Sequence, residues 1–416
     1  GKVYTCGSNK FGELGIGNDI INDQIQFQLI DSKYFNNENI IQICSGLSHS
    51  MVLSENGNVY SWGINLKGQT GLKYVQYVYT PKQIPNECFN NEHIKYINAG
   101  LNTSYCISSN GNVFVFGTNS YFQLGLAQRS KYCVPIQLPP DTFQNECIIK
   151  ICGGRYHTLF LSDQGNVFCC GYDSNGQLAT GTCHNYIKKI KKMNNNLFED
   201  EKVTNISTGD RHSIVLIQSG DILSCGVYFY GTYTSKEMVN VERFKTLPSD
   251  CIEEYVPTKV TNHDIQSNDI KFKSIYTAMK HSFVITNNNE IYGWGYGKYG
   301  QLGMGNYNNC IEPMKLNKHY VMNENIVSIS PSKGNHSLII TEYGKLFTCG
   351  NNENGQLGLK YKSNVYFPQR CNKQVFGNIH QILYDISKKQ IYKNNYYKDI
   401  IFEIGDIEPK RKKIKY

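Results

Sequence analysis

The sequence lacks the features that mark membrane, disulfide-rich and zinc-binding proteins. No apolar run approaches the ~18 residues of a membrane-spanning helix, so we expect no membrane partner. Alanine is scarce while Tyr, Ile, Val and Phe are plentiful, which favours strands over helices. The 15 cysteines are an odd number without a C-x-x-C pair, which argues against a disulfide framework or a zinc site. We therefore expect free, structural thiols and a reducing, intracellular compartment.

Basic charge is confined to two short runs. The formal charge is 42 − 34 = +8, and residues 187–192 (IKKIKK) and 408–416 (EPKRKKIKY) contribute +4 each. The first run is interpreted as a surface loop. The second resembles a short nuclear-import signal that could also touch nucleic-acid phosphates, with a solvated chain end as the alternative. Its basic residues are Lys410, Arg411, Lys412 and Lys413.

One template occurs seven times along the chain. Each copy has two apolar strand residues, an aromatic residue or Cys, a Gly, a polar turn, and in most copies Gly-Gln-Leu-Gly or a near match. The anchoring glycines are 56, 54, 54, 55, 69 and 55 residues apart: Gly7, Gly63, Gly117, Gly171, Gly226, Gly295 and Gly350. A fixed period of this size predicts a repeat architecture. Cys6, Cys170, Cys225 and Cys349 precede such glycines and are interpreted as small core hydrophobes.

A second motif, Ile-x-x-Ile-x-x-Gly-x-x-His-Ser, precedes six of the anchoring glycines. Its histidine position always lies 14 residues before the glycine: His49, Thr103, His157, His212, His281 and His336. A metal or catalytic site is one interpretation, but each histidine lies in a separate unit and Thr103 replaces one of them. We predict buried histidines that bond to neighbouring turns, without a metal.

The units predict an all-β fold, a seven-bladed β-propeller of ~55-residue repeats. Hairpins such as SENGN and SSNGN place Gly or Asn where a tight turn needs a positive φ, and no helical pattern alternates with the strands. The chain starts partway through a unit, and residues 379–392 look like a shortened partner. We expect strand 1–7 to pair with 379–392 and close the ring, giving a propeller at 1–405 and a basic tail at 406–416.

The two motifs together resemble the repeats of the regulator of chromosome condensation family, which are seven-bladed propellers. The likeness is strong over residues 1–360 and weak over 361–405. G-x-x-H-S followed by W-G-x-N-x-x-G-Q-L-G differs from the Gly-His/Trp-Asp signature of WD repeats and the paired glycines of kelch repeats. The fold implied by the resemblance leaves the function open, because propellers host many activities.

The residue before each histidine position varies freely while its neighbours do not. These residues are Ser48, Asn102, Tyr156, Arg211, Lys280 and Asn335. In the resembling family, loops on one propeller face contact the partner, and an acidic residue in one loop assists nucleotide exchange on the GTPase Ran. None of the six is acidic, and Asp210 is the nearest candidate. We predict partner contacts at Tyr156, Asp210, Arg211 and Lys280; the alternative is a solvated loop.

The fifth unit departs most from the template. After Gly226 it reads VYFYGTYTSKEMVNVERF without the Gln-Leu-Gly turn. Tyr228, Phe229 and Tyr230 on such a loop would be interface anchors. The Ran exchange factors of the resembling family also break one turn, where a β-wedge protrudes, but theirs is the third repeat in chain order. The alternative is a lineage-specific insertion.

No nucleophile–base pair, paired carboxylates or metal cluster stands out in the sequence. We therefore expect a binding module without covalent chemistry, cofactor or metal. The resemblance implies a guanine-nucleotide exchange factor for a Ran-like small GTPase, monomeric, nuclear and chromatin-associated. The alternative is a scaffold propeller of a larger signalling, ubiquitin-transfer or cytoskeletal protein. A direct nucleic-acid binder is a weaker third alternative, because the basic charge does not cover a face.

Overall fold

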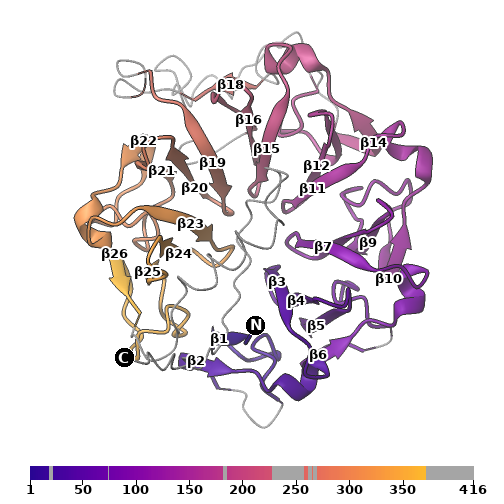
Figure 1. Ribbon diagram of the computed structural model, residues 1–416, viewed down its shortest axis with the longest axis horizontal. Helices are drawn as coiled ribbons and strands as arrows, with labels where there is room; N and C mark the ends of the chain where they lie inside the picture. The colour runs from indigo at the N-terminus through magenta and orange to yellow at the C-terminus, as the bar shows by residue number, and fades with distance from the viewer. Residues whose placement is uncertain are drawn as a thin grey trace, which may run out of the picture.

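The computed structural model of the chain is an all-β propeller (Figure 1). It describes residues 1–17, 22–73, 75–180, 185–226, 257–260, 265 and 269–371. Within these ranges, six four-stranded antiparallel sheets and one two-stranded sheet are arranged around a central axis.

Each blade is one sheet whose strands run in sequence order. Blade 1 contains β3 (Ile40–Ser45), β4 (His49–Ser54), β5 (Val59–Ile64) and β6 (Tyr77–Gln83). Blade 2 contains β7 (Ile94–Ala99), β8 (Thr103–Ser108), β9 (Val113–Thr118) and β10 (Lys131–Gln137). Blade 3 contains β11 (Ile148–Gly153), β12 (His157–Ser162), β13 (Val167–Tyr172) and β14 (Tyr186–Lys192), so the basic run 187–192 is an edge strand paired with β13 and the interpretation as a loop was wrong.

The second half of the chain repeats this order. Blade 4 contains β15 (Val203–Thr208), β16 (His212–Ile217), β17 (Ile222–Gly226) and β18 (Thr258–Lys259). Blade 5 contains β19 (Phe272–Thr277), β20 (His281–Thr286), β21 (Ile291–Gly295) and β22 (Cys310–Lys315). Blade 6 contains β23 (Ile326–Pro331), β24 (His336–Thr341), β25 (Leu346–Gly350) and β26 (Val365–Arg370).

The count of seven blades needs correction. The described residues form six complete blades, and β1 (Tyr4–Gly7) pairs with β2 (Gln24–Leu29) in a separate two-stranded sheet between blades 6 and 1 (Figure 1). β1 and β2 pair as the third and fourth strands of a blade do, for example β5 with β6, so β1 takes as its antiparallel partner the next strand along the chain. The predicted partner of strand 1–7, residues 379–392, lies outside the described residues.

The hairpins between second and third strands confirm the predicted turn chemistry. In blade 1, the Ser54 N–H donates to the Asn58 carbonyl over 2.9 Å, and Gly57 has φ 79°. The equivalent residue also has a positive φ in the other blades, where it is Gly111, Gly165, Gly220, Asn289 or Gly344.

Short 3-10 helices were not anticipated from the sequence. They connect the fourth strand of one sheet to the first strand of the next: η1 (Ser32–Phe35), η2 (Asn86–Phe89), η3 (Pro140–Phe143), η4 (Asn195–Phe198) and η8 (Lys318–Val321). The last residue of each is buried and apolar, and the following residue is left-handed. The repeated sequence F-x-N-E, as in FNNE and FQNE, is the signal that marks these turns.

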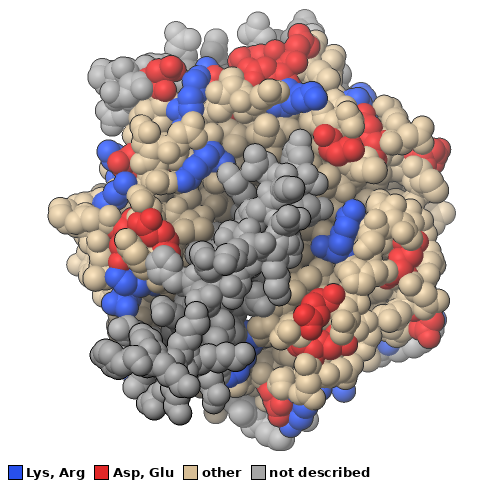
Figure 2. Space-filling view, viewed as in Figure 1, with Lys and Arg blue, Asp and Glu red and all other residues tan. Residues whose placement is uncertain are grey.

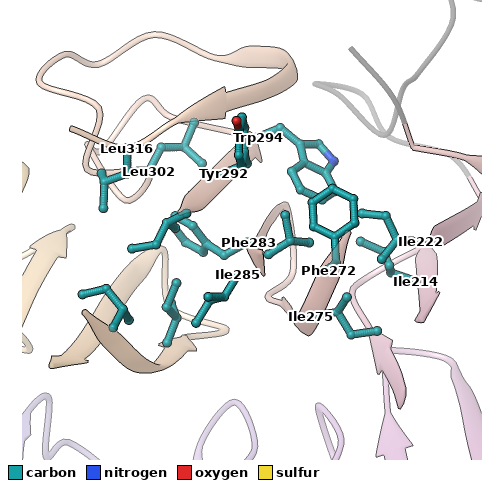
Figure 3. Close-up of a cluster of buried hydrophobic side chains, with 14 of the residues drawn as sticks. Ile214, Ile222, Phe272, Ile275, Phe283, Ile285, Tyr292, Trp294, Leu302 and Leu316 are labelled. Atoms are coloured by element: carbon teal, nitrogen blue, oxygen red, sulfur yellow. The ribbon is translucent and has the colours of Figure 1, made fainter. Parts of the chain in front are cut away.

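The core consists of apolar clusters between adjacent blades. Figure 3 shows one that joins Ile214 and Ile222 of blade 4 to Phe272 and Trp294 of blade 5. Trp294 is 1% exposed. Burial of this apolar area, at about 25 cal/mol per Å2, stabilises the contacts that fix one blade against the next.

Candidate partner-binding face

Two sets of turns gather on one face of the propeller. In an antiparallel sheet of four strands, the turn between strands one and two and the turn between strands three and four lie at the same end. The first set contains the G-x-x-H motifs, and the second contains the Gly-Gln-Leu-Gly motifs. We call this side the motif face; the hairpins and 3-10 helices lie at the opposite ends of the strands.

The backbone of the variable position is fixed by a repeated hydrogen bond. The carbonyl of Ser48 accepts from the N–H of Ile64, the residue after the anchoring glycine, over 2.8 Å. Equivalent bonds join Asn102 to Thr118, Tyr156 to Tyr172, Lys280 to Tyr296 and Asn335 to Asn351. The side chain takes no part in these bonds, so it can change without altering the turn.

The anchoring glycine is required by this close approach. Gly63 has φ 99°, and a Cβ there would lie 2.4 Å from the Ser48 carbonyl oxygen. The same contact is 2.4 Å at Gly117 and Gly171. Any other residue would combine a left-handed backbone with a steric clash, which explains why the sequence repeats Gly at this point.

The motif histidines join neighbouring blades. Nε2 of His49, His157, His212 and His281 lies 2.9–3.2 Å from a serine hydroxyl of the next blade. In blade 2 that hydroxyl, Ser104 Oγ, donates its proton to the Gln69 carbonyl over 2.7 Å. The serine must therefore accept from an Nε2–H group, which leaves Nδ1 unprotonated.

Burial keeps these imidazoles neutral. Desolvation lowers the pKa of His49, His157 and His281 to about 3, and it also holds the pKa of His212 well below its ordinary value. A Cβ on the motif glycine would meet the ring, at 2.1 Å for Gly46 against His49. The predicted burial is confirmed for these four, but their partners are serines on a strand of the next blade and not the predicted neighbouring turns; His336 is only half-buried.

Blade 2 makes the equivalent contact to the next blade with different residues. Thr103 replaces the histidine, and Tyr105 on the same strand brings its hydroxyl within 2.6 Å of Thr158 Oγ1 in blade 3. Thr158 in turn donates to the Gln123 carbonyl over 2.6 Å. The tyrosine hydroxyl thus takes the place of the imidazole Nε2.

The residue before the anchoring glycine bonds to the turn of the preceding sheet. Trp62 Nε1 donates to the Glu13 carbonyl over 2.8 Å, and Cys170 Sγ donates to the Gln123 carbonyl over 3.4 Å. Cys6, Cys225 and Cys349 make equivalent contacts at 3.4–3.6 Å. Cys170 and Cys349 are fully buried, as expected of core residues, and Cys6 and Cys225 are half-buried.

The predicted site residues occupy different environments on the motif face. Tyr156 and Arg211 are half-buried, and Lys280 is exposed with its ammonium 5.4 Å from the Tyr296 ring centroid. Asp210 is 8% exposed, and its Oδ2 accepts from Arg155 Nη1 over 3.2 Å. The carboxylate is therefore held within the turn and does not project from it.

Two other sets of predicted residues cannot be placed. Tyr228, Phe229 and Tyr230, and also Lys410, Arg411, Lys412 and Lys413, lie outside the described residues. Sequence reasoning missed Tyr121, Phe122, Tyr172 and Tyr186, which gather around Tyr156 on the motif face. Their signal was the excess of tyrosine in the turns of two successive units.

A cavity of 920 Å3 is lined by residues from several blades, among them the first strands. Lys150 Nζ donates to Asn205 Oδ1 over 2.9 Å, and Lys333 Nζ reaches the Ala99 carbonyl over 2.6 Å. Desolvation lowers the pKa of Lys333 to about 8. Each of these contacts joins one blade to another, so both lysines stabilise the arrangement of the blades.

Among the described residues seen in Figure 2, groups of both signs are scattered over a mostly uncharged surface. Within the described ranges, no group of three or more His, Cys, Asp and Glu side chains could hold a metal ion. Among those same residues, no helix is long and apolar enough to cross a membrane.

Comparison with protein families identifies the repeats. The model of the RCC1-like domain matches residues 1–227, and the model of the regulator of chromosome condensation repeat matches residues 288–338 and 343–382. The chain therefore belongs to the regulator of chromosome condensation (RCC1) repeat family.

Relatives of known function are diverse. The chain is 27% identical over 340 residues to the ultraviolet-B receptor UVR8 of Arabidopsis thaliana, covering 80% of this chain and 70% of the relative. It is 29% identical to the X-linked retinitis pigmentosa GTPase regulator homolog of Caenorhabditis elegans, covering 77% of this chain but 24% of that protein. It is 28% identical to the secretion-regulating guanine nucleotide exchange factor of Mus musculus, covering 72% and 61%.

Solved structures share the fold. Prp20p of Saccharomyces cerevisiae, whose structure was described with its binding to Gsp1p and histones, has a TM-score of 0.72 at 21% identity, covering 90% of this chain and 86% of that one. Human WBSCR16 has a TM-score of 0.72 at 20% identity, covering 89% and 94%. At this identity, the likeness shows the propeller fold alone.

Proposed function

We propose that this chain is a protein-binding propeller that acts as a guanine-nucleotide exchange factor for a Ran-like small GTPase. One observation carries the binding part. The turns of the motif face have a backbone fixed by repeated hydrogen bonds, while the side chain at each variable position is free to differ. A rigid frame with variable side chains is the arrangement that binding loops use.

The exchange part is supported by the relatives. The mouse relative is named a guanine nucleotide exchange factor, and the yeast protein of the same fold binds Gsp1p. An exchange factor needs no covalent chemistry, because stabilising the nucleotide-free GTPase is sufficient to speed release. The proposed protein is accordingly not an enzyme in the covalent sense.

The proposed ring is completed by residues outside the described ranges. The β1–β2 sheet contacts blade 6 in the way that blade 6 contacts blade 5. The Lys360 N–H in the last turn of blade 6 donates to the Ile25 carbonyl of β2 over 2.9 Å. Between blades 5 and 6, the Gly305 N–H donates to the Tyr366 carbonyl over 2.8 Å. We propose that residues 379–392 pair with the strand at 1–7 in this sheet, with a propeller at 1–405 and the tail at 406–416.

The decisive test is release of labelled GDP from a Ran-like GTPase of the same organism, with and without the full chain. We expect accelerated release, lost when Tyr228, Phe229 and Tyr230 are replaced together by Ala at an unchanged melting temperature. Hot-spot aromatics cost about 2 kcal/mol or more each when truncated. Absence of release by the unaltered chain would eliminate exchange and leave the scaffold alternative.

The proposed nuclear location depends on the basic tail. Deleting residues 410–413 from a tagged full chain should move it out of the nucleus. Nuclear accumulation unchanged by that deletion would remove the import interpretation, and a histone pull-down with the same two proteins would test the chromatin partner. Gel filtration coupled to light scattering would test the expected monomer.

A further inference from the structure

Four tyrosines converge on the motif face where blades 2 and 3 meet. Tyr121 comes from the third turn of blade 2, Tyr156 from the first turn of blade 3, and Tyr172 and Tyr186 from the facing ends of β13 and β14. The Tyr121 and Tyr156 ring centroids are 4.3 Å apart, and those of Tyr172 and Tyr186 are 5.7 Å apart. All four are half-buried, and we call them the tyrosine cluster.

Cations cover the edge of this cluster. The Arg129 guanidinium lies 4.7 Å from the Tyr186 ring centroid and 5.0 Å from that of Phe122. Lys188 Nζ lies 5.9 Å from the same Phe122 centroid. Arg129 and Lys188 are exposed, and neither makes a salt bridge with any acid in the part of the chain that the structure describes.

Phe122 supports the cations at a conformational cost. It has φ 63° at a turn position where other sheets have glycine: Gly12, Gly68, Gly176, Gly300 and Gly355. A bulky residue in that region is a strained outlier. Its ring is 5% exposed and lies under both Arg129 and Lys188, so the left-handed turn places an aromatic face against the cationic edge.

The chemistry of this surface favours an acidic peptide over a nucleic acid. Single-stranded nucleic acids bind by stacking bases on free aromatic faces. Here Arg129 lies over Tyr186, Arg155 lies over Tyr156, and Tyr121 packs against Tyr156, so these faces are already in contact. Guanidinium and ammonium groups remain as donors for carboxylates, for which arginine forms strong paired hydrogen bonds.

We propose that the tyrosine cluster, with Arg129 and Lys188, docks an acidic segment of a protein partner. The proposal rests on the protein-binding part of the proposed function and is independent of nucleotide exchange. Apolar ring edges would bury the aliphatic or aromatic side chains of that segment, while Arg129 and Lys188 pair with its carboxylates. Tyrosine and arginine are the residue types enriched at the energetic centres of interfaces.

The test measures binding of a fluorescein-labelled peptide of alternating Glu and Gly with a central Phe by fluorescence anisotropy. Controls are the same peptide with Gln for Glu, and an oligothymidylate of equal charge. We expect the acidic peptide to bind tightest to the full chain. Arg129→Gln with Lys188→Gln should weaken it on the order of tenfold, which is 1.4 kcal/mol.

A matched variant separates a site from general charge attraction. Lys82→Gln with Lys95→Gln removes the same charge from exposed positions near the opposite ends of their strands, and it should change the dissociation constant less than about twofold. Phe122→Gly should also weaken binding while the chain stays folded. Equal losses in both double variants, equal binding of the oligothymidylate, or no preference for Glu over Gln would overturn the proposal.

The two proposals fail in different ways. If the acidic peptide binds but GDP release is not accelerated, the docking surface stands and exchange is lost. If release is accelerated but no acidic peptide binds, the docking proposal alone is wrong. Accelerated release by the Arg129→Gln, Lys188→Gln variant would show that its loss of peptide binding does not come from unfolding.

Discussion

Arg155 and Asp210 occupy the same place in the first turns of blades 3 and 4, and Arg155 Nη1 lies 3.2 Å from Asp210 Oδ2. At the corresponding places in blades 1 and 2, Leu47 and Leu101 are joined through the backbone, the Leu47 N–H donating to the Leu101 carbonyl over 2.9 Å. A side-chain salt bridge thus joins two neighbouring turns of the motif face. Asp210, the acidic residue that the sequence suggested for nucleotide exchange, therefore has a structural role in this salt bridge.

Removing the arginine should destabilise the propeller. Arg155→Ala leaves the Asp210 carboxylate, 8% exposed, without its cation, and we expect a loss of about 1–3 kcal/mol in urea unfolding. Adding Asp210→Asn should recover part of that loss, because the uncompensated charge is gone. Lys33→Ala, which breaks the exposed pair with Asp31, serves as the control and should leave the urea midpoint almost unchanged. Strictly additive losses would contradict the coupling.

A double-mutant cycle can test whether Tyr105 makes the contact to blade 3 that a histidine at position 103 would otherwise make. Thr103→His restores the repeated motif but places an imidazole where Tyr105 already bonds Thr158. We expect it to destabilise the chain by about 1–3 kcal/mol through overpacking. In a Tyr105→Leu background the same change should cost less, because equivalent positions such as Leu159 accompany a histidine. Equal costs in both backgrounds would show that Tyr105 does not replace the imidazole.

The buried histidines predict a pH-dependent stability. The pKa of His157 is about 3 in the folded chain and about 6.5 when unfolded, so the unfolded state binds the proton between these values. Stability is therefore complete above pH ~6.5 and falls as the pH drops, by up to about 1.4 kcal/mol per pH unit for each such histidine. Urea unfolding between pH 7.5 and 4.5 should show a smaller slope for His157→Gln. His319→Gln, at an exposed position, serves as the control variant.

Asp173 should respond in the opposite direction. It stands where other turns have Asn65, Asn119 and Asn352, and burial raises its pKa to about 6 despite hydrogen bonds from Thr180 and Leu178. Since its pKa is raised on folding, its contribution is present at low pH and lost as the pH rises through ~6. We expect Asp173→Asn to stabilise the chain by about 1–3 kcal/mol at pH 7.5 and by less at pH 5. A destabilised variant at pH 7.5 would contradict this assignment.

The repeats predicted most of the frame and little of the binding surface. Positions that must be Gly or His carry a recurrent signal, because Gly63 and His49 each satisfy a contact that every blade needs. The glutamate of F-x-N-E also makes a contact that recurs between blades. Glu38 accepts from Asn58 Nδ2 over 2.8 Å, and Glu92 accepts from Asn112 Nδ2 over 2.7 Å. The spacing of 20 residues recurs in the third unit as Glu146 and Asn166.

The sequence by itself determined the repeat, its period, the turn chemistry and the burial of four motif histidines. Those features depend on residues close in the chain, or on contacts repeated in every blade, so they leave a periodic pattern. The tertiary structure alone decided that Arg155 pairs with Asp210, that Tyr105 replaces an imidazole, and that Phe122 lies beneath Arg129. Each of these contacts occurs once and depends on how neighbouring turns or blades meet. A contact that occurs once produces no repeated sequence pattern from which it could be predicted.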